Sequence, residues 1–343
     1  MKSGIYLGKE NVEVKEVPMP EVGDNDILIQ NIYSGICGTD VAVFNCGPNT
    51  GHKVTVGGEF GHETVSRIVK IGKNVTDFSL GERVYPYPLY AKGDTKRAGT
   101  IGGFSQYILI PNPKRNYSLY SVDEKITDKL AALIEPFTVG CRAARRGMIS
   151  CGRNQYIGGE NAVVFGSGTI GIAAAVAFKY FGMKKVMVCD LSDYRLNLAS
   201  GLGFETCNIS SENFQEKAKE YFGKARSVNG DVADIDCWLD AAGNETILNE
   251  FLSVGKLSSR YVLVAVNNAP RNISLLGLTY AQQSIIGSGG YMHEDVCDVQ
   301  KIMASGDWNL ESIITHEFPL EQLETAIRTA ADPNRSGSVV IKM

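Results

Sequence analysis

The sequence lacks several features that mark other broad classes of protein. It contains no unbroken apolar run of about 18 residues, so we predict no membrane-spanning helix. The net charge is −4 and no long basic run occurs, which argues against nucleic acid as the main partner. The N-terminal segment carries no apolar run of the kind found in a signal peptide, so we expect no export signal.

The cysteines are few and scattered, and no two of them form a C-x-x-C pair. Cys189 and Cys237 lie in apolar runs that are typical of buried strands. This distribution is typical of a reduced protein without a disulfide framework, and we therefore predict a cytoplasmic location. The positions are Cys37, Cys46, Cys141, Cys151, Cys189, Cys207, Cys237 and Cys297.

The length and composition indicate an ordinary globular protein with more than one domain. The chain has 343 residues, which is more than one hydrophobic core usually serves. Apolar residues make up 44% of the chain and charged residues 21%, as in most folded globular chains. Two domains are therefore the starting expectation.

The strongest motif lies near the middle of the chain. Residues 163–165 (Val-Val-Phe) predict a buried strand, and the turn that follows has the spacing G-x-G-x-x-G. An apolar helix over 172–181 and a second apolar run over 186–189 complete a βαβ unit. Such a turn brings the backbone and a helix N-terminus close to a pyrophosphate. The residues predicted to bind a dinucleotide here are Gly166, Gly168, Thr169, Ile170 and Gly171.

An acidic residue follows this motif at the expected distance. Asp190 ends the second strand of the unit, where a carboxylate can accept hydrogen bonds from both hydroxyls of the adenosine ribose. A 2′-phosphate beside Asp190 would place like charges together, so the sequence favours NAD over NADP. Arg195 follows shortly after and could soften this preference.

The first third of the chain predicts β-structure. Residues 12–17 alternate between apolar and polar, and residues 26–32 and 65–71 have strand-like composition. Glycine and proline turns separate these segments. We therefore expect a compact β-rich domain ahead of the dinucleotide-binding unit.

The same region contains the donor atoms of a possible metal site. Cys37 offers a thiolate, His62 an imidazole and Glu63 a carboxylate, and zinc accepts sulfur, nitrogen and oxygen donors. A catalytic zinc site keeps one position open for water or substrate. The spacing of the three residues is wide, so spacing alone does not distinguish a site from three unrelated side chains.

Further motifs follow one another in the order of a known family. The chain resembles the zinc-dependent medium-chain alcohol dehydrogenase superfamily and, within it, the sorbitol (polyol) dehydrogenase branch. The resemblance covers nearly the whole chain. The segments that carry it are 35–40 (Gly-Ile-Cys-Gly-Thr-Asp), 61–63 (Gly-His-Glu), 81–84 (Gly-Glu-Arg-Val), 132–140 (Ala-Leu-Ile-Glu-Pro-Phe-Thr-Val-Gly), 190–192 (Asp-Leu-Ser) and 315–320 (Thr-His-Glu-Phe-Pro-Leu).

The resemblance implies a fold and a domain organisation. The expected architecture is α/β, with a Rossmann doubly wound parallel sheet inserted in a GroES-like β-rich catalytic domain. The N-terminal part of the catalytic domain would cover 1–150 and the dinucleotide-binding domain 151–286, and 287–343 would return to the catalytic domain. The resemblance also implies a homodimer or homotetramer.

The resemblance further implies a role for each matching residue. Cys37 and His62 correspond to zinc ligands, and Glu63 corresponds to the third protein ligand of the polyol branch. Glu135 corresponds either to a direct ligand or to a partner that holds the zinc-bound water. Thr39 corresponds to the hydroxyl that takes the proton of the substrate. The strand ends expected to flank the nicotinamide contribute Ala242, Gly243, Val266 and Asn267.

The sequence departs from the family pattern at several places. Residues 85–104 contain no cysteine where many relatives carry four, so we expect one catalytic zinc per chain and no structural zinc. Ala42 stands where some relatives have a histidine that passes the proton to solvent. Gly290 precedes Tyr291 where the polyol branch has an arginine, so the substrate need not be sorbitol. Residues 150–158 form an extra segment without a functional interpretation.

Together these observations predict a zinc- and NAD-dependent oxidoreductase that interconverts a secondary hydroxyl of a polyol or sugar alcohol and the ketone. One alternative is a dehydrogenase of a pentitol or hexitol phosphate. Lys92, Lys96 and Arg97 form a small basic run that is either a solvated loop or a contact for a phosphate. An alternative of another class is a non-catalytic nucleotide-binding member, which would be expected to lose the ligands that this chain keeps.

Overall fold

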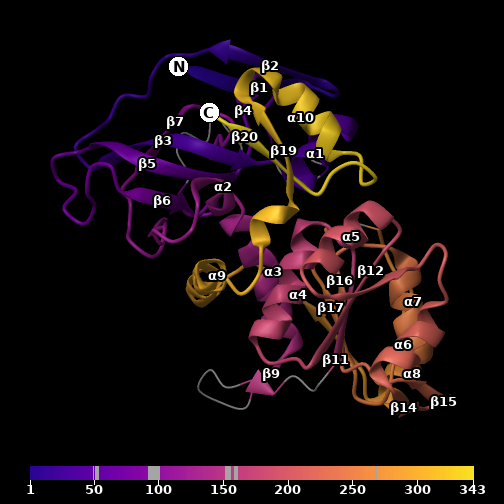
Figure 1. The fold of residues 1–343 in the computed structure, drawn as a ribbon. Coiled ribbons are helices and arrows are strands. Elements are labelled where there is room, and N and C mark those ends of the chain that lie inside the picture. The colour runs from indigo at the N-terminus through magenta and orange to yellow at the C-terminus, as the bar shows by residue number, and fades with distance from the viewer. Residues whose placement is uncertain (49, 51–53, 92–100, 151–155, 158–160, 267–268) are drawn as a thin grey trace. The chain divides into compact units, whose positions relative to one another are not determined.

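The computed structural model describes residues 1–48, 50, 54–91, 101–150, 156–157, 161–266 and 269–343. Its contacts divide the chain into two compact units (Figure 1). The first unit comprises Met1–Pro136 with Met303–Met343, and the second comprises Phe137–Ile302. This division runs through helix α3 (Ile134–Gly147) and assigns most of helix α9 (His293–Ser305) to the second unit, whereas the predicted boundaries lie at 150 and 286.

The first unit is a β-rich body, as its alternating sequence patterns predict. A seven-stranded sheet has the order β19-β20-β3-β5-β6-β8, with β7 also paired to β3, and a second sheet has the order β2-β1-β4. Most of the pairs are antiparallel. The strands are β1 (Lys2–Gly8), β2 (Asn11–Glu16), β3 (Asp26–Gly35), β4 (Gly58–Glu59), β5 (Glu63–Ile71), β6 (Arg83–Pro86), β7 (Tyr107–Pro111), β8 (Leu119–Ser121), β19 (Ile314–Pro319) and β20 (Ser338–Lys342).

Short helices close the first unit around two apolar clusters. One cluster places Phe44, Phe60 and Phe104 against apolar residues of the last helix, and the other gathers isoleucines of β3, β5 and β7. Because these side chains are almost fully buried, they are the main stabilising contribution of this unit. The helices are α1 (Gly38–Cys46), α2 (Asp128–Ala131), α10 (Leu323–Ala330) and the 3-10 turns η1 (Leu310–Ile313) and η2 (Leu320–Gln322).

The second unit is the predicted doubly wound parallel sheet. Its six strands have the order β13-β12-β11-β16-β17-β18, and all five pairs are parallel. Helices α3 and α4 lie on one face of the sheet, and α6, α7 and α8 lie on the other (Figure 1). The strands are β11 (Asn161–Phe165), β12 (Lys185–Asp190), β13 (Glu205–Asn208), β16 (Cys237–Asp240), β17 (Arg260–Leu263) and β18 (Ser284–Gly287).

The remaining elements of the second unit connect these strands or extend from them. Two small hairpins, β9 with β10 and β14 with β15, stand outside the main sheet. The connecting elements are α4 (Thr169–Tyr180), α5 (Asp193–Gly201), α6 (Phe214–Phe222), α7 (Glu245–Val254), α8 (Leu275–Ala281), β9 (Ile149–Ser150), β10 (Tyr156–Ile157), β14 (Lys224–Ser227) and β15 (Gly230–Ala233).

The glycine-rich turn between β11 and α4 has the predicted form. Gly166 has a φ of +100°, a conformation that disfavours other residues. A methyl group at Gly171 would lie 1.7 Å from the carbonyl oxygen of Gly166, so only glycine allows the helix to start this close to the strand. Helix α4 begins at Thr169, ahead of the predicted apolar run, because its first turn belongs to the motif itself.

Strand β17 is shorter than the sequence predicts. The apolar run over 261–266 suggests a strand to Val266, but β17 ends at Leu263. The backbone N–H groups of Val264 and Ala265 both donate to the carbonyl oxygen of Asp240, each at 3.1 Å, and this turns the chain away from the ladder. Val266 is consequently 71% exposed at the carboxyl edge of the sheet.

Candidate functional site

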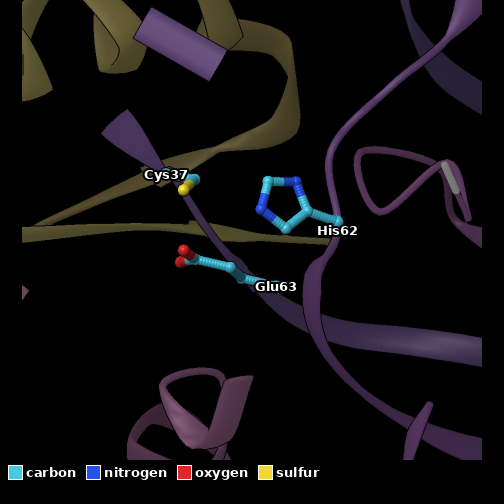
Figure 2. A group of neighbouring side chains, drawn as sticks. All are labelled: Cys37, His62 and Glu63. Atoms are coloured by element: carbon cyan, nitrogen blue, oxygen red, sulfur yellow. The ribbon is translucent and has the colours of Figure 1, made fainter. Parts of the chain in front are cut away.

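The three predicted metal ligands converge in the first unit. The sulfur of Cys37, a ring nitrogen of His62 and a carboxylate oxygen of Glu63 all lie within 4.8 Å of one another. Figure 2 shows the three side chains pointing toward one common space. Across the described ranges, this is the one group of three or more such side chains at metal-binding separation.

The local fold explains how residues so far apart in sequence meet. Cys37 follows the end of β3 and caps helix α1, whereas Glu63 begins β5, and these strands pair with Gly35 opposite Glu63. A methyl group at Gly35 would lie 2.3 Å from the carboxylate of Glu63. Glycine at position 35 therefore leaves the space that this carboxylate occupies. The hydroxyl of Ser34 also donates to the carbonyl oxygen of Glu63 at 2.8 Å.

Asp40 braces two of the three ligands. It is fully buried in the first turn of α1, and its Oδ2 accepts the backbone N–H of Cys37 at 3.0 Å. Its Oδ1 lies 3.8 Å from Nδ1 of His62. At this separation the contact is electrostatic and not a hydrogen bond, and the negative charge of Asp40 raises the pKa of the His62 ring.

The electrostatics of the group are those of a site that requires a cation. Burial, together with the negative charges of Asp40 and Glu135, raises the pKa of the Cys37 thiol to about 12. Burial, followed by the charges of Cys37 and Glu135, also raises the pKa of Glu63 well above its usual range. Burial acts to lower the pKa of His62, but the surrounding carboxylates, led by Asp40, raise it overall. The donor set therefore suits a divalent ion that takes the place of the protons.

Two further predicted residues border the group. Glu135, in the first turn of α3, is 8% exposed, and its charge acts on all three ligands. It does not belong to the set of donors within 4.8 Å of one another. The hydroxyl of Thr39 is buried and has no hydrogen-bond partner in the part of the chain that the structure describes. Against the larger effect of burial, the same side chain acts to lower the pKa of the Cys37 thiol, so Thr39 adjoins the ligand group.

The predicted dinucleotide residues form one edge of the second unit. Gly166, Gly168, Thr169 and Ile170 are partly exposed, and Gly171 is buried beneath them. Asp190 ends β12, and its carboxylate accepts N–H groups from Ser167 at 2.6 Å, Leu191 at 2.7 Å and Ser192 at 2.9 Å.

Arg195 lies close to the same turn. Its guanidinium would be 3.7 Å from a methyl group at Gly168, and its carbonyl oxygen accepts the hydroxyl of Ser167 at 2.9 Å. The structure therefore places both charged residues of the motif, Asp190 and Arg195, beside the glycine turn.

The sequence reasoning missed Asp240. This residue ends β16 and is 2% exposed. Its Oδ1 accepts the N–H groups of Ala242 at 2.9 Å and Gly243 at 2.6 Å, and its Oδ2 accepts the hydroxyl of Tyr261 at 2.8 Å. It thus shapes the strand end from which Ala242 and Gly243 were predicted to contact a nicotinamide. An aspartate directly before a glycine-containing strand end is the signal that could have identified it.

Some predicted residues lie outside the described residues. These are Asn267, the basic residues Lys92, Lys96 and Arg97, and most of the extra segment over 150–158. Among the described residues, no helix has the length and apolarity needed to cross a bilayer.

A β-rich unit with a converging Cys-His-Glu group and a second unit with a dinucleotide-type parallel sheet define a metal- and nucleotide-binding oxidoreductase class. Comparison with known proteins agrees with this assignment. Residues 23–119 match the family model of the alcohol dehydrogenase GroES-like domain, and residues 169–305 match that of the zinc-binding dehydrogenases. The chain belongs to the zinc-dependent medium-chain alcohol dehydrogenase superfamily.

Individual relatives are similar over almost the whole chain. The L-threonine 3-dehydrogenase of Yersinia pestis (strain Pestoides F) is 28% identical over 351 residues, which cover 97% of this chain and 96% of that protein. The fold is that of 2R,3R-butanediol dehydrogenase from Bacillus subtilis, with a TM-score of 0.82 at 20% identity over 100% of this chain and 99% of that one. Galactitol-1-phosphate dehydrogenase from Escherichia coli gives 0.81 at 21% identity, covering 100% of both chains.

Proposed function

We propose that the protein uses zinc and NAD to interconvert a secondary alcohol of a polyol or sugar alcohol and the ketone. The observation that carries the proposal is the convergence of Cys37, His62 and Glu63 beside the buried hydroxyl of Thr39. When bound, zinc supplies Lewis-acid polarisation of the hydroxyl, and NAD supplies the hydride acceptor.

The residues of the chain provide binding, orientation and a proton acceptor. Cys37, His62 and Glu63 would hold the metal, while Asp40 accepts the backbone N–H of Cys37 and places its negative charge beside the ring of His62. Thr39 would accept the proton of the substrate hydroxyl at its Oγ1 while its own hydroxyl proton passes on to the ribose, to water or to another residue, because Ala42 stands where some relatives have a relay histidine. Glu135 either completes the ligand set or holds a water molecule beside it. We propose one metal per chain, because residues 85–104 lack the cysteines of a second site.

The cofactor preference is proposed from Asp190. Its carboxylate is held in place at the end of β12 by three N–H groups, so its negative charge is fixed beside the glycine turn. A ribose with two free hydroxyls can donate to this carboxylate, whereas a 2′-phosphate would meet like charge. NAD is therefore the proposed cofactor, with Arg195 as a second contact of the adenosine end.

The class of substrate is proposed from two residues of the second unit and from the relatives. Tyr291, predicted near the substrate, is 7% exposed, and Gly290 before it provides no cation. A free polyol is proposed from the resemblance to the polyol branch, and a polyol phosphate is the second candidate because Gly290 departs from that branch and galactitol-1-phosphate dehydrogenase shares the fold. The similarity to an L-threonine 3-dehydrogenase makes this hydroxy amino acid a necessary comparison.

The test is NADH formation on a substrate panel, with and without a zinc chelator. The panel contains free polyols, polyol phosphates, L-threonine and simple secondary alcohols. We expect chelator-sensitive turnover on a free polyol, restored by added zinc. The Cys37→Ser variant should lose bound zinc and turnover while ADP-ribose affinity stays within about twofold, because the turn that would bind it lies in the other unit. Full activity of this variant at the wild-type zinc content would contradict the ligand assignment.

We also propose a homodimer formed by the second unit. Among the described strands, β18 is an edge strand, and an unpaired strand edge is a template for pairing with another chain. Helix α8 beside it exposes Leu275, Leu276 and Tyr280, at 73%, 67% and 68%. Exposed apolar side chains grouped beside a free strand edge are typical of an interface between subunits.

A further inference from the structure

The loop after β18, residues 288–292, lies at the carboxyl edge of the parallel sheet. The N–H of Ser288 donates to the carbonyl oxygen of Leu263 at 2.9 Å, which joins the loop to the end of β17. Gly289 has a φ of +71°, and Tyr291 is buried. Ligands of doubly wound sheets bind outside this edge, so the position of the loop bears on the dinucleotide of the proposed function.

Both ends of this loop are fastened to helix α3 by arginines. At the first end, Nε of Arg146 donates to the carbonyl oxygen of Gly287 at 3.3 Å. At the second end, the N–H of Met292 donates to Oδ2 of Asp295 at 2.8 Å, and Nε of Arg145 donates to Oδ1 of the same carboxylate at 2.6 Å. Arg145 therefore reaches the backbone of the loop through Asp295.

Arg145 itself is locked in place. It is 7% exposed, its guanidinium lies 4.7 Å from the ring centre of Phe181, and its Nη2 donates to Asp298 at 2.6 Å. Asp298 also accepts hydrogen bonds from Tyr180 and Lys301, and these two residues lie outside the loop. Arg145 thus has two arms, one that ends on the loop through Asp295 and one that ends on helices α4 and α9 through Asp298.

The Arg145–Asp295 pair contributes more to the orientation of the loop than to the stability of the fold. Asp295 is fully buried, and taking such a pair out of water costs about as much as the mutual attraction returns. What the planar fork of an arginine adds is a fixed direction for both of its acceptors. We infer that Arg145 and Asp295 are positioning residues, which hold the loop 288–292 at the side of the sheet away from Asp190, where the nicotinamide half of a bound dinucleotide would lie. This inference rests on the proposed function.

The two arms of Arg145 offer a matched pair of variants in the full-length chain. Asp295→Asn breaks the arm that reaches the loop, and Asp298→Asn breaks the other arm. NADH binding is measured by fluorescence titration, and binding of ADP-ribose, which lacks nicotinamide, by calorimetry. For Asp295→Asn we expect NADH affinity to fall about 5- to 10-fold, the size of one lost hydrogen bond, with ADP-ribose affinity within about twofold. Asp298→Asn should leave both affinities within about twofold.

Two further variants keep the test decisive if Asp295→Asn fails to fold. Arg145→Lys keeps the charge and loses the fork, so we expect the same selective loss of NADH affinity. Lys256→Met breaks the ion pairs with Asp234 and Asp236, both 2.5 Å long, at the opposite edge of the same sheet. It should lower the melting temperature without changing the ratio of NADH to ADP-ribose affinity.

The outcomes separate the inference from the proposed function. Equal effects of Asp295→Asn and Asp298→Asn on NADH, or a lower melting temperature with unchanged NADH affinity in Asp295→Asn and Arg145→Lys, would overturn the positioning role and leave the cofactor proposal standing. A wild-type chain that binds neither ADP-ribose nor NADH would overturn the proposed cofactor, and the inference with it.

Discussion

At the scale of single residues, Asp190 combines a structural and a proposed ligand-binding role. Three backbone N–H groups fix the direction of its carboxylate. An ionised carboxylate has about four acceptor positions, so these bonds leave room for a ribose hydroxyl. The residue that shapes the turn is thus also the one that would distinguish the two dinucleotides.

Replacing Asp190 should relax the preference for NAD. In Asp190→Ala the ratio of kcat/KM for NAD to that for NADP should fall about tenfold or more, because charge-assisted bonds to the ribose are lost and repulsion of a 2′-phosphate disappears. The Asp190→Asn variant retains an acceptor oxygen for the N–H groups of the turn, so it controls for disruption of the turn structure. An unaltered ratio in both variants would remove Asp190 from the cofactor site.

The metal-ligand group was predictable from the sequence, whereas the role of one buried carboxylate was not. Cys37, His62 and Glu63 were predicted from their chemistry and their family motifs, and the structure brings them together. Asp240 was missed because its importance comes from Tyr261 and from two N–H groups that only the folded strand end presents. The sequence alone does not show which hydrogen-bond partners will surround a given side chain in the folded protein.

At the scale of elements, the turn from β11 into α4 depends on close approach of the helix to the strand. Gly171→Ala should lower the free energy of unfolding by about 1–3 kcal/mol or more, since its methyl group would overlap the carbonyl oxygen of Gly166. ADP-ribose binding should weaken with it. Gly201→Ala, in helix α5, has no atom within 4 Å of its methyl group and should be neutral or stabilise by about 0.5–1 kcal/mol.

Chemical unfolding and calorimetry of the two variants provide the comparison. Equal stability of Gly171→Ala and the wild type would show that the turn can relax, and that the glycine is not required by packing. A large loss in Gly201→Ala would instead indicate that alanine in general is poorly tolerated in this unit.

The order and type of the elements were more predictable than their ends. The parallel sheet and the strands β3, β5 and β12 follow from apolar runs and alternation. The end of β17 did not, because the competing partner is the carbonyl oxygen of Asp240 on a neighbouring strand. Hydrophobic pattern reports which face is buried, but the residue at which a ladder stops is set by such contacts between strands.

At the scale of the whole molecule, zinc should act as a pH-dependent stabiliser. Burial and the neighbouring carboxylates raise the pKa values of Cys37 and Glu63, so these donors hold protons that a bound metal must displace. Metal affinity therefore rises as pH rises, by about 1.4 kcal/mol per pH unit for each proton released.

We expect the gain in melting temperature on adding zinc to the chelator-treated protein to be larger at pH 8 than at pH 6. Differential scanning calorimetry at the two pH values is the measurement, with Cys37→Ser as the variant that should show no gain. A gain of equal size at both pH values would mean that the donors bind without losing protons.

The proposed dimer contact at helix α8 can be tested with a charged substitution. Leu276→Glu should convert the proposed dimer into a monomer, because a buried charge at an apolar interface costs several kcal/mol. Leu80, in the first unit, has the same exposure of 67%, and Leu80→Glu is the matched control that should leave the mass unchanged. Sedimentation velocity distinguishes the two. A dimer that survives Leu276→Glu would exclude this face.

The last strand of the chain has a consequence for biosynthesis. β20 pairs with β3, with Val340 opposite Gly35, and the N–H of Ile36 donates to the carbonyl oxygen of Val339 at 3.0 Å. The segment that leads into Cys37 pairs with β5 on one side, and it therefore gains its neighbour on the other side only when residues 338–342 have been made. During synthesis all the strands of the parallel sheet are made before β20, so the segment that leads into the thiol ligand keeps one unpaired edge until residues 338–342 have been made.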